Sequence, residues 1–358
     1  MEQTNPSADM IDLFTQPAFL VKDRSIVHSN QAALQLQINP GTDISSLLLT
    51  GAEEYTAFQG GSLFLTVSTG GISSNATVTR VGSEDVFLLD EDTLQKELHG
   101  LSLAALELRQ PLSTLMTLAD KLLPVQAAEG NSTLQSQIAQ FNQGLYQMLR
   151  LIGNMSFAEK YSSKPSVFTE TCNISAFFEE LFLSAEVLAA KADRKLHFSC
   201  SEKDVLCLAN KELLERAALN LISNAIKFSP KGSRIHAEVF RRKGTLFLTV
   251  ENAKGDCAPS STKELFSTFL RPSGIHDGRQ GIGLGMVLVR SAASAHGGTV
   301  LIEQTADSIK VTLTIKLRQS TGTELRSKFL NVDYAGERDH KLIELADALP
   351  SSAFDQIH

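Results

Sequence analysis

Two long stretches of the sequence repeat apolar residues at alternating spacings of three and four, over residues 94–122 and again over 134–155. Such heptad stripes are typical of helices that pack along a coiled-coil-like seam. The segment 124–130 between them starts with Pro and ends with Gly, so we predict a helical hairpin over residues 91–161. Two helices alone cannot bury both stripes. We therefore predict a homodimer in which two hairpins form a four-helix bundle.

The segments on either side of the hairpin have different patterns. Residues 8–90 alternate short apolar runs with Gly, Asn and Ser, which predicts a small α+β domain with a mainly antiparallel sheet. Residues 165–318 alternate helical and strand patterns, which predicts a two-layer α/β sandwich. The tail 319–358 contains one predicted helix, 339–349, and its pattern indicates no function. The expected fold class is therefore multi-domain α+β.

Charge and hydropathy exclude several classes of protein. Lys and Arg total 33 against 40 Asp and Glu, a formal net charge of −7, which argues against a nucleic-acid binder. No apolar run approaches the roughly 20 residues that span a bilayer, so we expect no membrane span. The first residues lack the order of a secretory signal, and the four cysteines lack metal-ligand spacing. These features favour a cytoplasmic protein with buried thiols.

One predicted helix displays a polar face with a specific chemistry. Asn220, Asn224 and Lys227 follow one another at i, i+4 and i+7, so two amides and an ammonium share one side of the helix. Amide oxygens suit Mg²⁺, and a lysine can neutralise phosphates. A solvated helix face would show the same residues, so this segment alone leaves both interpretations open.

A glycine cluster precedes the next predicted helix. Gly281, Gly283 and Gly285 alternate with Ile282 and Leu284, which lets the backbone approach an anion at the start of a helix. No Gly-Lys-Ser/Thr follows, and the spacing is not that of the dinucleotide fingerprint. A flexible loop would also explain the glycines.

The two segments, in this order and about 60 residues apart, resemble the ATP-binding domain shared by sensor histidine kinases, gyrase B, Hsp90 and MutL, the GHKL or Bergerat fold. Residues 220–229 resemble the N box, 281–285 the second glycine box, and 265–271 the phenylalanine box of the histidine-kinase branch. The resemblance implies ATP and Mg²⁺ as cofactors, with Asn220 and Asn224 holding the metal. It implies ATP contacts from Asn220, Asn224, Lys227, Phe228, Asn252, Phe266, Phe269, Gly281, Gly283, Leu284 and Gly285.

The adenine-binding box departs from the family pattern. The family has a strand that ends in Asp-x-Gly-x-Gly, whose Asp receives the adenine amino group. By register Asn252 replaces that Asp, and Lys254 stands where the first glycine belongs. An Asn carbonyl still accepts a hydrogen bond, but without the charge that strengthens it. Glu251 is the rival residue, although strand alternation points it to the other face.

The hairpin extends the resemblance to histidine kinases. Residues 105–112 resemble the H box, but Leu106 stands in place of the phosphorylated His. A leucine supplies no nucleophile for phosphoryl transfer. The resemblance assigns Glu107 the role of base and Gln110 that of orienting water during dephosphorylation of a response regulator. His99, seven residues before Leu106, is either a displaced acceptor or an ordinary surface residue.

The N-terminal segment resembles a PAS sensor domain. Residues 16–23 and 25–33 are similar to its first strands and helix, and 86–93 to the strand that leads into a signalling helix. His28 is either a haem ligand or a surface strand residue, and no cysteine lies where a flavin adduct is expected.

Three functions follow from the resemblance. The first is a two-component sensor kinase that binds ATP–Mg²⁺ and acts on a response regulator, with autophosphorylation opposed by Leu106. The second is a response-regulator phosphatase that uses Glu107 and Gln110. The third is an ATP-binding pseudokinase or scaffold.

Overall fold

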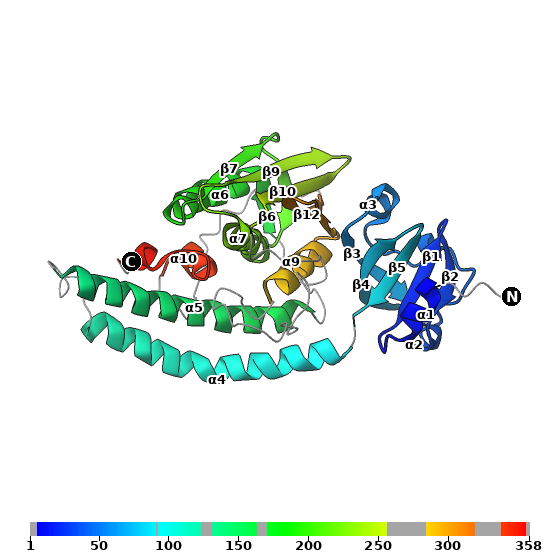
Figure 1. The fold of residues 1–358 in the computed structure, drawn as a ribbon, viewed down its shortest axis with the longest axis horizontal. Helices are drawn as coiled ribbons and strands as arrows, with labels where there is room; N and C mark the ends of the chain where they lie inside the picture. Colours follow the sequence, from blue (N-terminus) through cyan, green and yellow to red (C-terminus); the bar gives the residue numbers. More distant parts are fainter. Residues whose placement is uncertain are drawn as a thin grey trace.

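The computed structural model describes residues 6–90, 92–122, 131–162, 170–255, 284–318 and 338–355. Figure 1 shows an N-terminal α/β part, a pair of long helices, and a second α/β part that lies along those helices. No helix within the described ranges combines the length and hydropathy that crossing a lipid bilayer requires.

The N-terminal part is an antiparallel sheet of order β2-β1-β5-β4-β3 flanked by short helices, as its alternating pattern predicts. Phe19 and Phe87 stack at 4.8 Å between ring centroids in its core. The elements are α1 (Pro6–Asp12), β1 (Ala18–Lys22), β2 (Ser25–Ser29), α2 (Gln31–Gln35), η1 (Ile44–Ser46), α3 (Ala52–Ala57), β3 (Ser62–Thr69), β4 (Ile72–Val81) and β5 (Glu84–Leu89).

The two predicted helices are α4 (Asp92–Leu122) and α5 (Ser132–Ser162), which lie side by side in Figure 1. Part of the apolar stripe of α4 is buried, including Ala105 and Leu112. The rest faces outward, with Leu108 44% and Leu115 47% exposed. The stripe is therefore wider than one partner helix can cover.

The third part is an α/β sandwich in which α6, α7 and α9 pack on a sheet of order β11-β12-β10-β9-β7. The β9–β10 hairpin turns at Lys243 and Gly244, both with positive φ. Cys172 and Cys207 face each other as buried thiols across the separate β6–β8 pair. The elements are β6 (Glu170–Asn173), α6 (Ile174–Lys191), β7 (Lys195–Cys200), β8 (Leu206–Ala209), α7 (Lys211–Phe228), β9 (Arg234–Arg242), β10 (Thr245–Ala253), α9 (Leu284–Ala295), β11 (Val300–Gln304) and β12 (Ser308–Lys316).

The two sheets join edge to edge. β3 pairs antiparallel with β11, with Phe64 opposite Val300 and Ser62 opposite Ile302, so all described strands except β6 and β8 form one ten-stranded sheet. Arg290 on α9 binds Asp90 at 2.6 Å and lies over the Phe64 ring. The strand patterns gave no indication of this pairing.

The C-terminal segment lies between α5 and α7 (Figure 1). It contains α10 (His340–Leu345) and the 3-10 turn η3 (Ser351–Phe354). Asp339 caps α10 by accepting a hydrogen bond from the Lys341 backbone amide. The predicted helix over 339–349 is therefore too long at its end, because the chain turns after Leu345 to follow the surface of α5.

Candidate functional site

The candidate site is built on α7. Its first turn is capped by Asn210, whose side chain accepts from the Leu213 amide, and its apolar side packs in the domain core. Asn220 lies in the middle of this helix with only 1% of its surface exposed. A buried amide requires partners for both its oxygen and its nitrogen, and Asn220 is the most deeply buried of the expected site residues that the structure describes.

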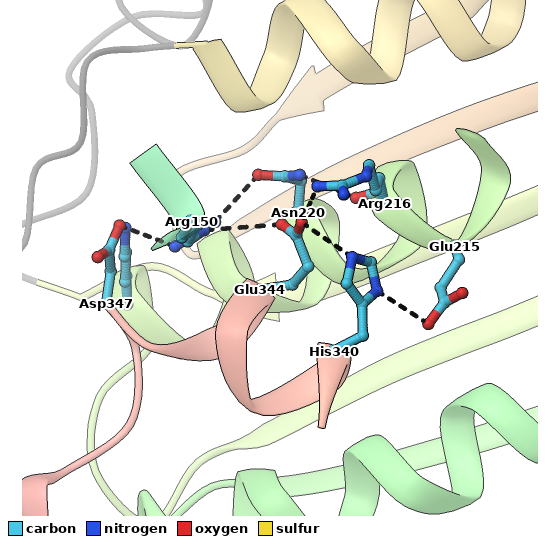
Figure 2. A network of polar contacts seen from close by, with 8 residues as sticks. Arg150, Glu215, Arg216, Asn220, His340, Glu344 and Asp347 are labelled. Carbon is cyan, nitrogen blue, oxygen red and sulfur yellow. Dashed lines mark hydrogen bonds and ion pairs between the residues drawn. The ribbon is translucent and has the colours of Figure 1, made fainter. Parts of the chain in front are cut away.

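Both polar atoms of the Asn220 side chain are satisfied. Its Oδ1 accepts from Nη2 of Arg150, on α5, at 3.0 Å. Its Nδ2 donates to the Arg216 carbonyl oxygen at 2.8 Å. Figure 2 shows Asn220 directed toward Arg150 at the centre of a charged network.

The start of α9 lies directly against this amide. A Cβ added to Gly285 would come within 2.5 Å of Asn220 Oδ1, so a side chain at position 285 would displace the Asn220 amide. The next residue, Met286, accepts a weak hydrogen bond through its Sδ from Asn224 Nδ2 at 3.5 Å. The expected juxtaposition of the Asn220 helix and the last glycine of the cluster is thus present, and Leu284 is buried beside it.

The end of α7 meets the end of β10. The Phe228 carbonyl oxygen accepts from the Gly255 amide at 2.8 Å, and a Cβ on Gly255 would approach that oxygen to the same distance. Asn252 is 7% exposed, and its Nδ2 donates to the Ala253 carbonyl at 2.8 Å. Glu251 is more exposed than Asn252, in agreement with the strand alternation that favours Asn252 for the interior.

Some expected site residues cannot be placed. Phe266, Phe269, Gly281 and Gly283 lie outside the described residues.

The H-box residues lie on α4. Leu106 is 51% exposed beside the fully buried Ala105, as its position next to the stripe predicts. Glu107 and Gln110 are also exposed. Arg109 donates to Ser156 Oγ on α5 at 2.9 Å, so α4 presents the two candidate phosphatase side chains outward while Arg109 fastens it to α5.

A charged network surrounds the α7 face, and sequence reasoning missed it. Glu344 on α10 is completely buried and pairs with Arg216 and Arg150, which are also buried (Figure 2). Asp347 binds Arg150 Nη1 at 2.8 Å and Lys227 Nζ at 3.2 Å. One signal was available in the sequence, since Glu344 is an acid flanked by the apolar residues Ile343 and Leu345.

His340 completes the network. Burial alone would lower its pKa, but its hydrogen bond to Glu215, at 3.3 Å, and the Glu344 carboxylate outweigh that effect and raise the pKa above its usual value. Arg216 opposes the shift. The protonated form of His340 is therefore favoured when α10 is docked.

The residues present fit a metal–triphosphate ligand in their chemistry. Two amides and an ammonium lie on one helix, and Gly285 at the start of α9 presents no Cβ toward Asn220. The described residues contain no group of three or more His, Cys, Asp or Glu arranged for a metal. Amide oxygens, water and phosphate form a ligand set that Mg²⁺ accepts.

Residues 209–321 match the family model described as "Histidine kinase-, DNA gyrase B-, and HSP90-like ATPase". This chain is a relative of the sensor histidine kinases. It is 27% identical to the sensor protein KdpD of Clostridium acetobutylicum over 54% of the chain and 22% of KdpD. It is 26% identical to the histidine protein kinase DivJ of Caulobacter vibrioides over 55% of the chain and 33% of DivJ.

One solved structure shares the fold of part of this chain. Full-length ShkA, crystallised in complex with AMPPNP, is 16% identical and superposes with a TM-score of 0.50 over 62% of this chain and 46% of ShkA. The chain spans less than half the length of each of these relatives.

Proposed function

We propose that the chain is a two-component signalling protein that binds ATP–Mg²⁺ on the α7 face and acts on a response regulator in the cytoplasm. The observation that carries the proposal is the buried Asn220, which lies against Gly285 of α9 on the same helix as Asn224 and Lys227. An apolar residue at position 220 would pack in this interior at lower cost, so a buried amide indicates a polar task.

The roles follow from the chemistry of each side chain. The amide oxygens of Asn220 and Asn224 would hold Mg²⁺, and Lys227 would neutralise phosphate charge. Asn252 would accept from the adenine amino group. Bound metal would supply charge neutralisation of the triphosphate. Phe228, Leu284 and Gly285, with Phe266, Phe269, Gly281 and Gly283, would complete the ATP site.

Autophosphorylation at the H box is not part of this proposal. Leu106 is exposed where a partner could reach it, but its side chain has no nucleophilic atom. Response-regulator phosphatase activity is the second candidate, because Glu107 and Gln110 are exposed one helical turn apart on α4. A pseudokinase, which binds nucleotide without either reaction, is the remaining alternative.

The remaining parts extend the proposal to the whole chain. We propose a PAS-like sensor domain at 8–90, a dimerisation domain at 91–161, an ATP-binding domain at 165–318 and a tail at 319–358. A second copy would cover seven outward apolar side chains of the helical pair that are 42–52% exposed: Leu103, Leu106, Leu108, Leu115, Leu118, Phe141 and Met148.

Calorimetric titration with ATP and MgCl₂ tests the nucleotide site. We expect saturable binding that Asn224→Ala weakens about tenfold or more, because one metal ligand is lost. Asn39→Ala removes an exposed amide in the N-terminal part and serves as the matched control. Equal affinity for wild type and Asn224→Ala would contradict the proposal.

Two further assays separate the activities. With γ-labelled ATP, label is expected on Leu106→His but not on the wild-type chain, and label on wild type would show that another residue accepts the phosphoryl group. With a phosphorylated response regulator, faster decay that Gln110→Ala abolishes indicates the phosphatase. Unchanged decay indicates the pseudokinase.

A further inference from the structure

The C-terminal segment 338–355, here named the plug, lies on the same helix face as the proposed ATP site. Its Asp347 carboxylate binds Lys227 at 3.2 Å, and Lys227 belongs to the proposed phosphate-binding group. The same carboxylate binds Arg150 Nη1 at 2.8 Å, while Nη2 of Arg150 donates to Asn220. One acidic side chain therefore reaches, directly or through one arginine, two of the residues proposed to hold ATP–Mg²⁺.

A second acid strengthens the contact. Glu344 has no exposed surface and lies between Arg150 and Arg216, which are 5% and 3% exposed (Figure 2). Buried charges persist only when they are paired, because water no longer solvates them. The two arginines therefore need an anion at this position, and Glu344 supplies it.

The plug is held mainly by the helical pair. Gln143 on α5 donates to the Leu349 carbonyl at 2.8 Å, and Asn142 donates to the Phe354 carbonyl at 3.2 Å. Phe354 packs on Tyr146 with 5.2 Å between ring centroids. Arg338 binds Asp120 on α4 at 2.7 Å. These contacts can keep the plug attached to α4 and α5 when Glu344 and Asp347 no longer bind the α7 side chains.

We propose that the plug competes with nucleotide for the α7 face. Its carboxylates bind Lys227 and Arg216 directly, and they hold Arg150 against the Asn220 amide, which a metal–triphosphate would use. This inference rests on the proposed ATP site. A triphosphate and the pair Glu344–Asp347 are both multivalent anions, so either one neutralises the cations. Nucleotide then binds only those molecules in which the plug has released α7. The apparent Kd therefore equals the intrinsic Kd divided by the fraction of such open molecules.

Charge-removing variants of the full chain test the competition. Asp347→Ala deletes the carboxylate that engages Lys227 and keeps the apolar anchors of the plug. We expect it to lower the apparent Kd for ATP–Mg²⁺ about tenfold, because the open fraction rises. Asp355→Ala removes an exposed acid of the same segment and is expected to leave the Kd unchanged.

Hydrogen exchange of the wild-type chain gives a second readout. Saturating ATP–Mg²⁺ is expected to raise exchange in α10, while exchange in the β9–β10 hairpin stays constant. Binding of nucleotide with the same Kd in wild type and Asp347→Ala, and with unchanged exchange in α10, would overturn the plug and leave the ATP site intact. Absence of nucleotide binding in the wild type and in both variants would overturn the ATP site and the plug together.

Discussion

The N-terminal sheet and the C-terminal plug both attach to the histidine-kinase-like ATPase part, but through different chemistry. The sheet attaches at β3–β11 by a backbone ladder, which is supplemented by the Asp90–Arg290 ion pair. The plug attaches to α7 through the buried pair Glu344–Arg216 and the pair Asp347–Lys227, beside apolar packing of Ile343 and Leu345. A backbone ladder is made of N–H···O=C bonds that carry no titratable charge, whereas a buried ion network depends on the charge of each member. The difference indicates a permanent junction at β3–β11 and a releasable one at α7.

The strongest test of this contrast removes the central acid of the plug. Glu344→Ala leaves Arg150 and Arg216 without their shared carboxylate. We expect this to make the free energy of docking of α10 less favourable by about 3–5 kcal/mol. Native-state hydrogen exchange in α10 measures the effect. Glu303→Ala, which removes an exposed partner of Lys310, is the control. It should change the free energy of hydrogen-exchange protection in α10 by less than about 0.5 kcal/mol. Full protection of α10 in Glu344→Ala would contradict a charge-dependent junction.

The sheet junction is sensitive at one backbone position. Gly61 has φ +88°, and an added Cβ would lie 2.2 Å from the Ile302 carbonyl oxygen on β11. We expect Gly61→Ala to destabilise the fold by about 1–3 kcal/mol in denaturant unfolding, because the backbone must shift at the junction. Gly60→Ala has open space around the new Cβ and is the matched control. Equal unfolding midpoints for the two variants would show that the β3–β11 edge is not tightly held.

The ion pair beside the sheet junction should contribute less. Asp90 and Arg290 are 26% and 13% exposed in their side chains, so solvent screens their attraction in part. A double-mutant cycle with Asp90→Asn and Arg290→Gln is expected to give a coupling free energy of about 0.5–1 kcal/mol. A coupling free energy of several kcal/mol would show that the β3–β11 junction depends on charge as strongly as the plug does.

The smallest expected effect is the change with pH in how stably the plug docks on α7. The docked plug raises the pKa of His340, so the stabilisation from its protonated form is fully present below the ordinary value of 6.5 and is lost as the pH rises through the docked value. Glu215 and Glu344 favour the charge, and Arg216 opposes it. An NMR titration should find the His340 pKa above 6.5 and that of His296 below it, since burial lowers the latter. In Glu215→Gln, the His340 pKa should fall, and no change would contradict the assigned cause.

The sequence was informative where structure depends on local patterns. The heptad stripes, the helix that carries Asn220 and the start of α9 all follow from near neighbours in the chain. Asn220 and Gly285 could be paired because a motif order links them. The β3–β11 junction and the contacts of Glu344 join residues more than a hundred positions apart, and no spacing rule reports such contacts. The predicted tail helix was too long for the same reason, because packing against α5 decides where it ends.

Arg150 links the helical pair to α7 and to the plug. Its guanidinium is carried by α5 yet contacts Asn220, Glu344 and Asp347. Advancing α5 by a single residue about its own axis swings each side chain through about 100°. Such a rotation of α5 would withdraw the guanidinium from all three contacts at once, and so would change the charge that surrounds Asn220 on α7.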